Sequence, residues 1–219
     1  MGKRGPKPKR KEPLRQTPEL AYAVGLLVTD GCLSSSGRHI DLTSKDVEQL
    51  NNLKKCLEIK TKISYKTSSY TNKKYPRLQF SDVVLYKFLE SIGMTPAKTK
   101  TIGKLDIPDK YFFDFLRGHH DGDGCFYSYW DPRWKSSFMY YLTFISASKK
   151  HVLWLQDKIK VLLVVAGRVN KNGSLYQLRF AKKESLKILK KMYPNKNVVC
   201  LSRKRLKIEK ALGIVGESL

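Results

Sequence analysis

The chain contains two copies of one short pattern, a predicted helical segment that ends at Asp-Gly. The first copy occupies residues 23–31 (AVGLLVTDG) and the second occupies residues 116–124 (LRGHHDGDG). Glycine directly after a helix-forming run ends a helix, so each copy predicts a helix that stops at the motif. A helix C-terminus carries a partial negative charge, which makes a carboxylate there unfavourable without a nearby cation. Asp30 and Asp123 therefore predict a paired cation site where the two helix ends meet.

The same order of elements follows both copies, which predicts a duplicated unit of about ninety-five residues. In the first unit, the motif helix begins at Thr17 and Pro18, and a strand follows at residues 38–44. Ser44 is expected to cap a helix that runs through Leu57. Two more strands are expected at residues 62–66 and 77–80, and Ser81 is expected to cap a last helix that ends at Gly93. In the second unit, the motif helix begins at Pro108, and strands are expected at residues 125–130, 139–146 and 176–180. Ser148 is expected to cap a helix between the second and third of these strands, and a final helix runs through Met192.

This order predicts an α+β fold. Each half has the order αββαββα, with one antiparallel four-stranded sheet and the helices on one face of it. The two pseudo-symmetric halves are expected at residues 17–93 and 106–219, with a linker at residues 94–105.

Small residues recur at a spacing of four on both motif helices. They are Ala21, Gly25 and Thr29 in the first helix, and Gly118 and Gly122 in the second. Such a stripe lets two helix backbones approach closely, because no large side chain separates them. Packing of the two stripes would bring the carboxylates to one end of the helix pair.

Hard divalent cations such as Mg²⁺ accept oxygen ligands from two carboxylates that would otherwise repel each other. We therefore expect Asp30 and Asp123 to bind the metal. The backbone carbonyls of Thr29 and Gly122, freed at the helix ends, are expected as further ligands. Metal ions held in this way activate water and stabilise the leaving oxygen in phosphodiester hydrolysis.

The formal net charge is +24, from 43 Lys and Arg against 19 Asp and Glu. The excess runs along the whole chain and predicts a polyanionic partner, with nucleic acid first because neutralised phosphates release counterions. Membrane-surface and ribosomal proteins are also basic. No apolar run approaches the ~18–20 residues of a membrane span, and the N-terminus lacks the apolar core of a secretory signal. We expect neither a membrane partner nor secretion.

The four cysteines, Cys32, Cys56, Cys125 and Cys200, are too widely spaced for a zinc knuckle. As free thiols they fit a reducing compartment, either a cytoplasm or a DNA-containing organelle. We expect all four to be small, buried core residues.

Residues 1–16 (MGKRGPKPKRKEPLRQ) hold seven Lys or Arg and three Pro, which predicts disorder in isolation. Within this segment, KRGPKP resembles the Arg-Gly-Pro core of minor-groove AT-hook segments. Two interpretations stand side by side: a solvated tail, and a basic arm that lies along DNA.

Both motif copies resemble the signature of the LAGLIDADG homing endonucleases. Residues 115–124 (FLRGHHDGDG) are similar to the second motif of single-chain, two-repeat members, and the resemblance extends from residue 17 to about residue 212. It implies a saddle of two four-stranded antiparallel sheets that straddles the major groove of DNA, with the motif helices packed at its centre. It also implies cleavage of both strands across the minor groove, leaving short 3′ overhangs.

In that family the last Asp of each motif binds the catalytic metal ions, so the resemblance gives this role to Asp30 and Asp123. The expected ion is Mg²⁺; Mn²⁺ is expected to substitute for it, and Ca²⁺ to support binding without cleavage. Val28 stands where the motif name has its first Asp, at a position that varies in the family.

The family often also uses a Lys, Arg or Gln of each half to organise solvent around the metals. Gln79 and Arg179, at matching places before the last helix of each half, are candidates, and Lys182 is a further one. An equally good interpretation is that all three contact only DNA.

Base readout is expected from outward-facing strand residues and their loops. Arg and Gln form bidentate contacts with purine edges, whereas many Lys side chains touch only phosphate. The candidates are Arg38, Lys62, Lys66, Arg77, Arg133, Lys135, Gln177, Arg179 and Lys182. The alternative for each one separately is a solvated surface charge.

Two groups of rings have a structural and a functional interpretation. Tyr127, Tyr129, Trp130 and Trp134 cluster in the second hairpin, where core packing or a cover over the sheet is expected. His119 and His120 replace apolar residues of the motif. We expect them at the helix interface or against a sheet, and the alternative is a metal or phosphate role.

The sequence thus predicts a monomeric, site-specific, metal-dependent endonuclease that acts on double-stranded DNA with a long, rare target site. The alternative on the same fold is an RNA maturase that helps its host intron splice, or a non-cleaving DNA-binding regulator. Two retained carboxylates favour the enzyme, because a pure binder has no need to hold repelling charges together. A basic ribosome-associated protein would lack the paired motif.

Overall fold

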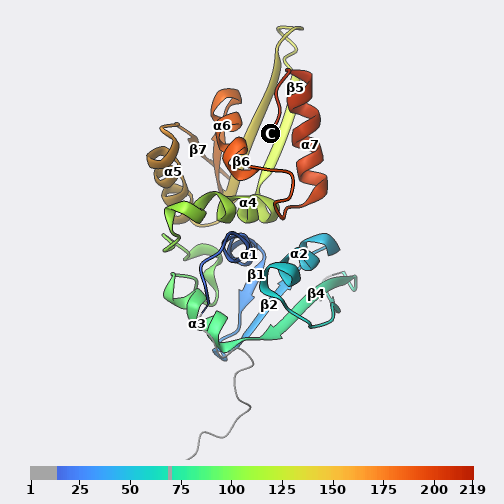
Figure 1. Ribbon diagram of the computed structural model, residues 1–219, viewed down its shortest axis with the longest axis vertical. Helices are drawn as coiled ribbons and strands as arrows, with labels where there is room; N and C mark the ends of the chain where they lie inside the picture. The colour runs from blue at the N-terminus through green and yellow to red at the C-terminus, as the bar shows by residue number, and fades with distance from the viewer. Residues whose placement is uncertain (1–13, 69–70) are drawn as a thin grey trace, which may run out of the picture.

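The computed structural model describes residues 14–68 and 71–219, so nearly all of the expected basic arm at residues 1–16 lies outside the described residues. Two halves stack on either side of a central pair of helices, α1 (Pro18–Thr29) and α4 (Phe112–Asp123) (Figure 1). These are the helices of the two Asp-Gly motifs. The Thr17 hydroxyl accepts the Leu20 N–H at 3.1 Å and Pro18 fills the first position, so the start of α1 is as predicted.

In the first half, α1 is followed by β1 (Gly31–Leu33), β2 (His39–Thr43), α2 (Val47–Leu57), β3 (Ser64–Thr67), β4 (Lys74–Ser81) and α3 (Val83–Ser91). A segment with two 3-10 turns, η1 (Lys98–Lys100) and η2 (Asp109–Tyr111), connects it to α4. The second half continues with β5 (Cys125–Trp130), β6 (Phe138–Ser146), α5 (Lys149–Leu163), β7 (Arg168–Asn172), β8 (Leu175–Phe180), α6 (Lys182–Met192) and α7 (Ser202–Ile214).

Both sheets have the same strand order. It is β1-β2-β4-β3 in the first half and β5-β6-β8-β7 in the second, with every pair antiparallel. The predicted fold class of two αββαββα halves is therefore confirmed. The short strands β1 and β7 were not predicted separately, because three or five residues of mixed polarity carry too little periodicity to be recognised.

Two predicted helix caps are wrong by one or two residues. Asp46, not Ser44, caps α2, because Ser44 directly follows β2 and its N–H donates to the Pro76 carbonyl of β4. Asp82, not Ser81, caps α3, because Ser81 is the last residue of β4. Ser148 caps α5 as predicted.

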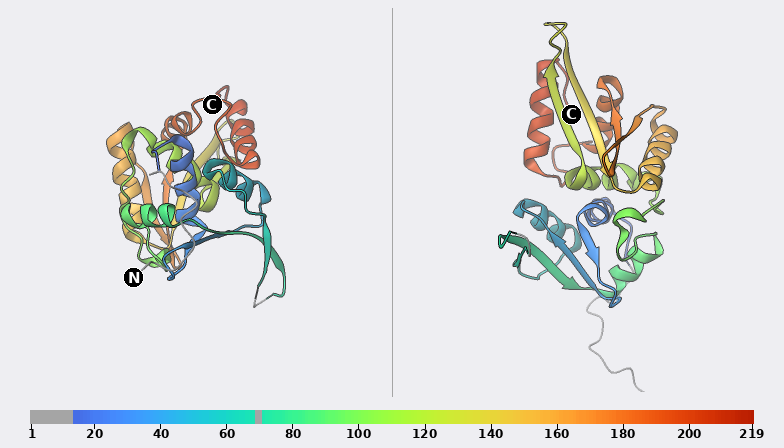
Figure 2. Two further views of the ribbon diagram at one scale, coloured as in Figure 1. Left: turned by 60° about the horizontal axis from the view of Figure 1, so that its bottom comes forward. Right: turned by 180° about the vertical axis from the view of Figure 1, so that it is seen from behind.

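Each sheet has an apolar face under its helices and an open face on the other side. The buried face of the first sheet consists of Leu33, Ile40, Leu42, Leu78 and Phe80. The buried face of the second sheet consists of Phe126, Tyr140, Leu142, Phe144, Leu178 and Phe180. Strand alternation therefore places Gln79, Gln177 and Arg179 on the open faces. Viewed from behind, the β5–β6 hairpin extends far from the central helix pair (Figure 2).

The helix α7 was not predicted. Its sequence (SRKRLKIEKALGI) has charged residues through its first three turns, and Leu201 before it supplies no side-chain cap. Among the described residues, no helix is long and apolar enough to cross a membrane.

Candidate cation site and nucleic-acid surface

The motif helices α1 and α4 touch through glycine. A Cβ atom on Gly25 would lie 2.2 Å from the carbonyl oxygen of Phe115, and one on Gly118 would lie 2.1 Å from that of Tyr22. Both carbonyls belong to the packed backbone of the facing helix, so only glycine fits at these positions. The predicted stripe of small residues is therefore the contact surface between the two helices.

This contact brings the two motif carboxylates to the same end of the helix pair. A Cβ atom on Gly122, next to Asp123, would lie 2.9 Å from Asp30 Oδ2. Burial raises the pKa of both carboxyl groups, and the charge of Asp30 raises the pKa of Asp123 further. A divalent cation would offset both effects, which makes this helix end a suitable place for one.

Gln49 of α2 holds one of these carboxylates. Its Nε2 donates to Asp30 Oδ2 at 2.6 Å, and its Oε1 accepts the Ser44 hydroxyl at 2.6 Å, so the amide is fixed at both ends. Gln49 is buried on the same side of α2 as Leu53. Sequence reasoning missed this residue, although a polar side chain four residues before a core leucine was the available signal.

Lys98 reaches the site from the segment between the halves. Its ammonium group is buried and donates to the carbonyl of Gly31, directly after Asp30. Burial lowers the pKa of Lys98, while the nearby charges of Asp30 and Asp123 act in the opposite direction. The sequence placed this lysine in a linker, among other lysines, with no feature to distinguish it.

Lys204 of α7 reaches the site from the other side. Its Nζ donates to the carbonyls of His120, Gly122 and Gly124, at 3.2 Å from Gly122 and 2.8 Å from Gly124. A cation at a helix C-terminus is favourable, so Lys204 caps α4. The Gly122 carbonyl, which we expect as a metal ligand, accepts this ammonium group. The Thr29 hydroxyl turns back onto the carbonyls of Gly25 and Leu26.

Gln79 and Arg179 occupy equivalent places in the two sheets, as their matching positions predicted. Gln79 is paired with Asp41 of β2, and Arg179 with Thr143 of β6. A full strand therefore separates each of them from β1 or β5, the strands that leave the motif helices. In the described chain, neither donates a hydrogen bond to Asp30 or Asp123.

Lys182 lies on the helical side of its sheet. It is the first residue of α6, its Nζ donates to the carbonyl of Phe138 at 3.3 Å, and it approaches the buried ring of Tyr140. The expectation that it shares a surface with the strand residues is therefore wrong. The helix α6 begins after the chain has turned from β8 towards the covered face.

The remaining candidates for DNA contact differ in whether their side chains are exposed or already paired with another side chain. Arg38, Lys62, Lys66 and Lys135 are exposed, and every residue of β3, which carries Lys66, is exposed. Arg77 forms an ion pair with Asp41, and the guanidinium of Arg133 donates two hydrogen bonds to Asp131. Gln177 is half-buried on β8, opposite Ile145. The open faces are thus basic, with some of the arginines already paired.

The aromatic cluster of the second hairpin divides into two parts. The rings of Tyr127, Tyr129 and Tyr141 stack in near-parallel orientation on the open face, with Arg179 over two of them. These tyrosines cover the sheet, as expected. Trp130 and Trp134 are 53% and 69% exposed, so the predicted core packing is wrong for both. The reason is that the hairpin extends beyond the helices that cover its base (Figure 2).

His119 and His120 lie in the core. His119 stacks on His151 with ring centroids 5.3 Å apart and packs edge-on against Phe115, while His120 packs against Phe144. Burial lowers the pKa of both imidazoles well below its usual value, so the rings are neutral near pH 7. They fill the space between α4 and the second sheet.

All four cysteines are free thiols, but the expectation that they are buried core residues fails, because none of the four is fully buried. Cys32 and Cys125 are exposed, and Cys56 and Cys200 are half-buried. Cys32 and Cys125 each stand two residues after a motif aspartate, on the first open-face position of β1 and β5, where strand alternation turns the side chain outward.

Comparisons with known proteins identify the fold. Residues 17–93 match the family model of the LAGLIDADG-like domain. The homing endonuclease I-WcaI, solved bound to its DNA recognition sequence, superposes with a TM-score of 0.64 at 14% identity, covering 93% of this chain and 94% of that one. The I-LtrWI LAGLIDADG homing endonuclease, solved bound to target DNA, gives a TM-score of 0.59 at 12% identity, with 90% of each chain covered.

A second kind of structure is also similar. Full-length DUF199/WhiA from Thermatoga maritima superposes with a TM-score of 0.58 at 14% identity over 94% of this chain, which spans 62% of that protein's length. No curated protein matches the chain by sequence.

The fold and the paired motif define a class, the two-repeat α+β proteins with two Asp-Gly helices at their centre. Within that class, the N-terminal half carries a LAGLIDADG-like domain, and the whole chain has the single-chain, two-repeat LAGLIDADG fold.

Proposed function

We propose that this chain is a site-specific endonuclease that hydrolyses double-stranded DNA with divalent metal ions. The observation that carries the proposal is the pairing of Asp30 and Asp123 at the ends of α1 and α4, through a glycine contact that brings two carboxylates together. The cost of holding like charges together is hard to explain for a protein that only binds. The basic open faces and the net charge of +24 support DNA as the partner.

The donor set suits Mg²⁺ better than a metal that needs a closed protein site. No group of three His, Cys, Asp or Glu in residues 14–68 and 71–219 could hold a metal ion. Mg²⁺ commonly binds one or two carboxylates and takes its other ligands from water and substrate phosphates. When bound between Asp30 and Asp123, the ion would supply charge stabilisation and an activated water.

The protein residues around the carboxylates have separate roles in this proposal. Gln49 keeps Asp30 in one orientation through its 2.6 Å hydrogen bond. Lys98 and Lys204 supply two ammonium groups that can stabilise the negative charge developing on a phosphate. Gln79 and Arg179 then serve in DNA contact, since a strand separates each from the site.

The test is cleavage of a DNA library by the purified chain with Mg²⁺ or Mn²⁺. Asp30→Asn and Asp123→Asn should each abolish cutting and leave binding in Ca²⁺ largely intact. Asp157→Asn, the same change on the exposed face of α5, is the matched control and should cut normally. Normal cutting by both motif variants would overturn the metal assignment. Light scattering should give one chain per DNA duplex, because one chain supplies both motifs.

A non-cleaving DNA-binding regulator is the second candidate. It is supported by the likeness to full-length DUF199/WhiA and by the contact of Lys204 with the Gly122 carbonyl. Sequence-specific binding without cutting in either Mg²⁺ or Mn²⁺ would select it. Preference for intron RNA over duplex DNA in the same binding assay would instead select the maturase.

For each of these functions we expect the protein to work in a reducing compartment, in keeping with its free thiols.

A further inference from the structure

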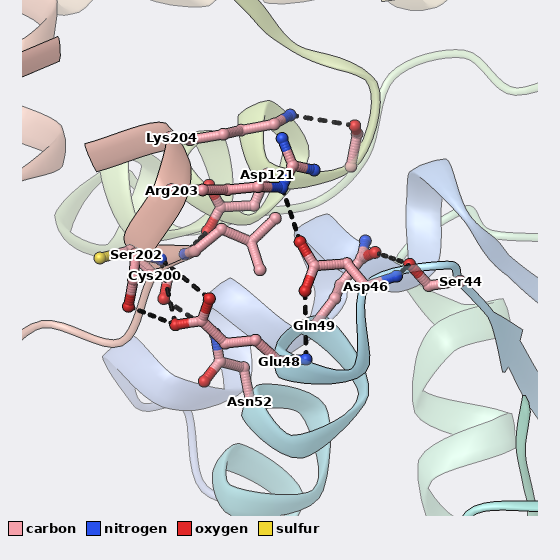
Figure 3. A network of polar contacts seen from close by, with 12 residues as sticks. Ser44, Asp46, Glu48, Gln49, Asn52, Asp121, Cys200, Ser202, Arg203 and Lys204 are labelled. Atoms are coloured by element: carbon pink, nitrogen blue, oxygen red, sulfur yellow. Dashed lines mark hydrogen bonds and ion pairs between the residues drawn. The ribbon is translucent and has the colours of Figure 1, made fainter. Parts of the chain in front are cut away.

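The first turn of α7 is capped by other helices. Its N-cap residue, Leu201, has no hydroxyl or carboxylate to bind the free N–H groups of a helix start. Instead, Asp121 Oδ2 of α4 accepts the Leu201 N–H at 2.8 Å, and the Glu48 carboxylate of α2 accepts the Ser202 N–H at 3.0 and 3.2 Å. The Ser202 hydroxyl donates to the same carboxylate. Figure 3 shows Glu48 facing Ser202 across the boundary between the two halves.

Two further contacts tie the same turn to α2. Arg203 Nε donates to Asp46 Oδ2 at 2.6 Å, and Asn52 Nδ2 of α2 donates to the Cys200 carbonyl at 2.9 Å. The Arg203 side chain is 62% exposed, so its ion pair contributes little by itself. The Glu48 contact differs in kind, because a carboxylate that accepts N–H and O–H bonds at a helix start also interacts with the positive end of the helix.

Lys204 lies on this capped turn. Its flexible side chain places the ammonium group among three carbonyls at the C-terminus of α4. There the ammonium group interacts electrostatically with the carboxylates of Asp30 and Asp121. Holding a long lysine side chain in one geometry costs conformational entropy, and this cost rises if its backbone can also move. The turn that carries Lys204 must therefore be fixed for the ammonium group to stay beside the paired carboxylates.

The same stretch of the first half also fixes Gln49. Ser44 Oγ accepts the Asp46 N–H at 3.0 Å and donates to Gln49 Oε1, so residues 44–49 orient Gln49 toward Asp30. Figure 3 places Ser44 and Asp46 just before α2 and Glu48 and Gln49 in its first turn. Residues 44–49 at the start of α2 thus support groups on both sides of the candidate site.

We propose that Glu48 is a positioning residue: by capping α7 from the opposite half, it holds Lys204 beside Asp30 and Asp123 for the cleavage step. The inference rests on the proposed function for its catalytic consequence, but the placement of Lys204 can be measured without cleavage.

The first test measures the accessibility of the Lys204 amine by amine acetylation and mass spectrometry. In the wild-type chain, Lys204 should react more slowly than Lys207 and Lys210, which are exposed on the same helix. Glu48→Gln should raise the Lys204 labelling rate by roughly five- to tenfold, as expected for a lost helix cap, and leave Lys207 unchanged. Glu217→Gln, the same change at an ion pair with Lys190, is the matched control and should not alter Lys204 labelling.

The second test measures single-turnover cleavage at saturating DNA. Glu48→Gln should slow the step by about tenfold without changing DNA affinity, and Glu217→Gln should change neither. In a Lys204→Met background, Glu48→Gln should produce no further loss, because the group it positions is gone. Ser202→Ala, which removes only one donor, provides a milder variant if Glu48→Gln does not fold.

The outcomes separate the two proposals. Unchanged Lys204 labelling in both Glu48→Gln and Ser202→Ala would overturn the positioning role. An equal loss of rate from Glu48→Gln with and without Lys204 would overturn it as well. A wild-type chain that binds but never cuts would overturn the proposed function, while the labelling result would still decide whether Glu48 places Lys204.

Discussion

The Tyr22 hydroxyl donates a hydrogen bond to Asp121 Oδ2 at 2.8 Å, across the contact between the two motif helices. The same carboxylate oxygen accepts the Leu201 N–H at 2.8 Å, so α1, α4 and the start of α7 meet at one atom. Burial raises the pKa of Asp121 to about 6, although both donors lower it. This buried carboxyl is the third aspartate near the motif ends, and its role is to join helices.

Replacement of Tyr22 by Phe should therefore destabilise the fold. The change removes one of two donors to a buried carboxyl group, which is expected to cost about 1–3 kcal/mol. Urea denaturation measures the difference. Tyr193→Phe is a matched control, because within the described chain the Tyr193 hydroxyl is buried with no hydrogen-bond partner, and its loss should be neutral or stabilising. An equal loss from both variants would contradict the role of the Tyr22 bond.

Replacement of Gly118 by Ala should prevent close packing of the motif helices. The added methyl group would lie 2.1 Å from the carbonyl oxygen of Tyr22, so we expect a loss of more than about 3 kcal/mol, or no folding. Gly213→Ala supplies the control: it is also helical, but a Cβ there has nothing within 4 Å. That variant should gain about 0.5–1 kcal/mol from helix propensity. Thermal unfolding of the two alanine variants tests the contrast, and a stable Gly118→Ala protein would refute the contact.

Acid should destabilise the protein through the stacked pair of His119 and His151. Burial lowers the pKa of His151 from 6.5 to about 4, and it lowers that of His119 as well. Between those values the unfolded chain binds more protons than the folded chain, so stability is present above pH 6.5 and falls as the pH drops toward 4. The shift of His151 corresponds to about 3 kcal/mol.

His151→Asn isolates this effect. The Asn amide can still donate to the Gly103 carbonyl, which the imidazole Nδ1 contacts at 2.9 Å, but it takes up no proton in this range. The buried Asp121 acts in the opposite sense below pH 6 because its pKa is raised, and it is present in both proteins. Denaturant titrations from pH 4 to pH 7 should therefore give a flatter curve for the variant. Parallel curves would rule out His151 as the source.

DNA binding should depend on salt through the open faces of the sheets and not through the helices. Lys66→Gln changes an exposed lysine of β3, and we expect weaker binding with the slope of log K against log salt reduced by about one. Lys150→Gln on α5 removes an equally exposed charge from the helical layer and should leave the slope unchanged. Fluorescence anisotropy at several salt concentrations measures both. A reduced slope for Lys150→Gln alone would mean that DNA lies on the opposite surface.

Features that depend on neighbouring residues could be predicted from the sequence. Gly31, Gly93 and Thr17 mark helix ends because turns and caps are local, and strand alternation follows from a period of two. The glycine stripe predicted the helix contact, and the repeat predicted two sheets of one topology. The Asp-Gly motifs were recognisable because both copies end a predicted helix and are followed by the same order of strands and helices.

The groups that complete the candidate site depend on contacts between distant residues. Lys98 resembles any linker lysine until the fold brings it to Gly31. Gln49 is a single polar residue on an apolar helix face until Asp30 meets it. The strand that separates Gln79 from the motif becomes apparent only once strand order is known.

The sequence by itself therefore determined the duplicated fold and the pairing of Asp30 with Asp123, since both follow from short patterns that fix backbone conformation and helix contact. Only the tertiary structure decided which cations stand beside that pair. The start of α7 has no cap of its own and is held by Glu48 and Asp121, which are far away along the chain. Lys204 reaches the motif because those two carboxylates satisfy the free N–H groups of its helix, and no local pattern encodes a hydrogen bond between distant segments.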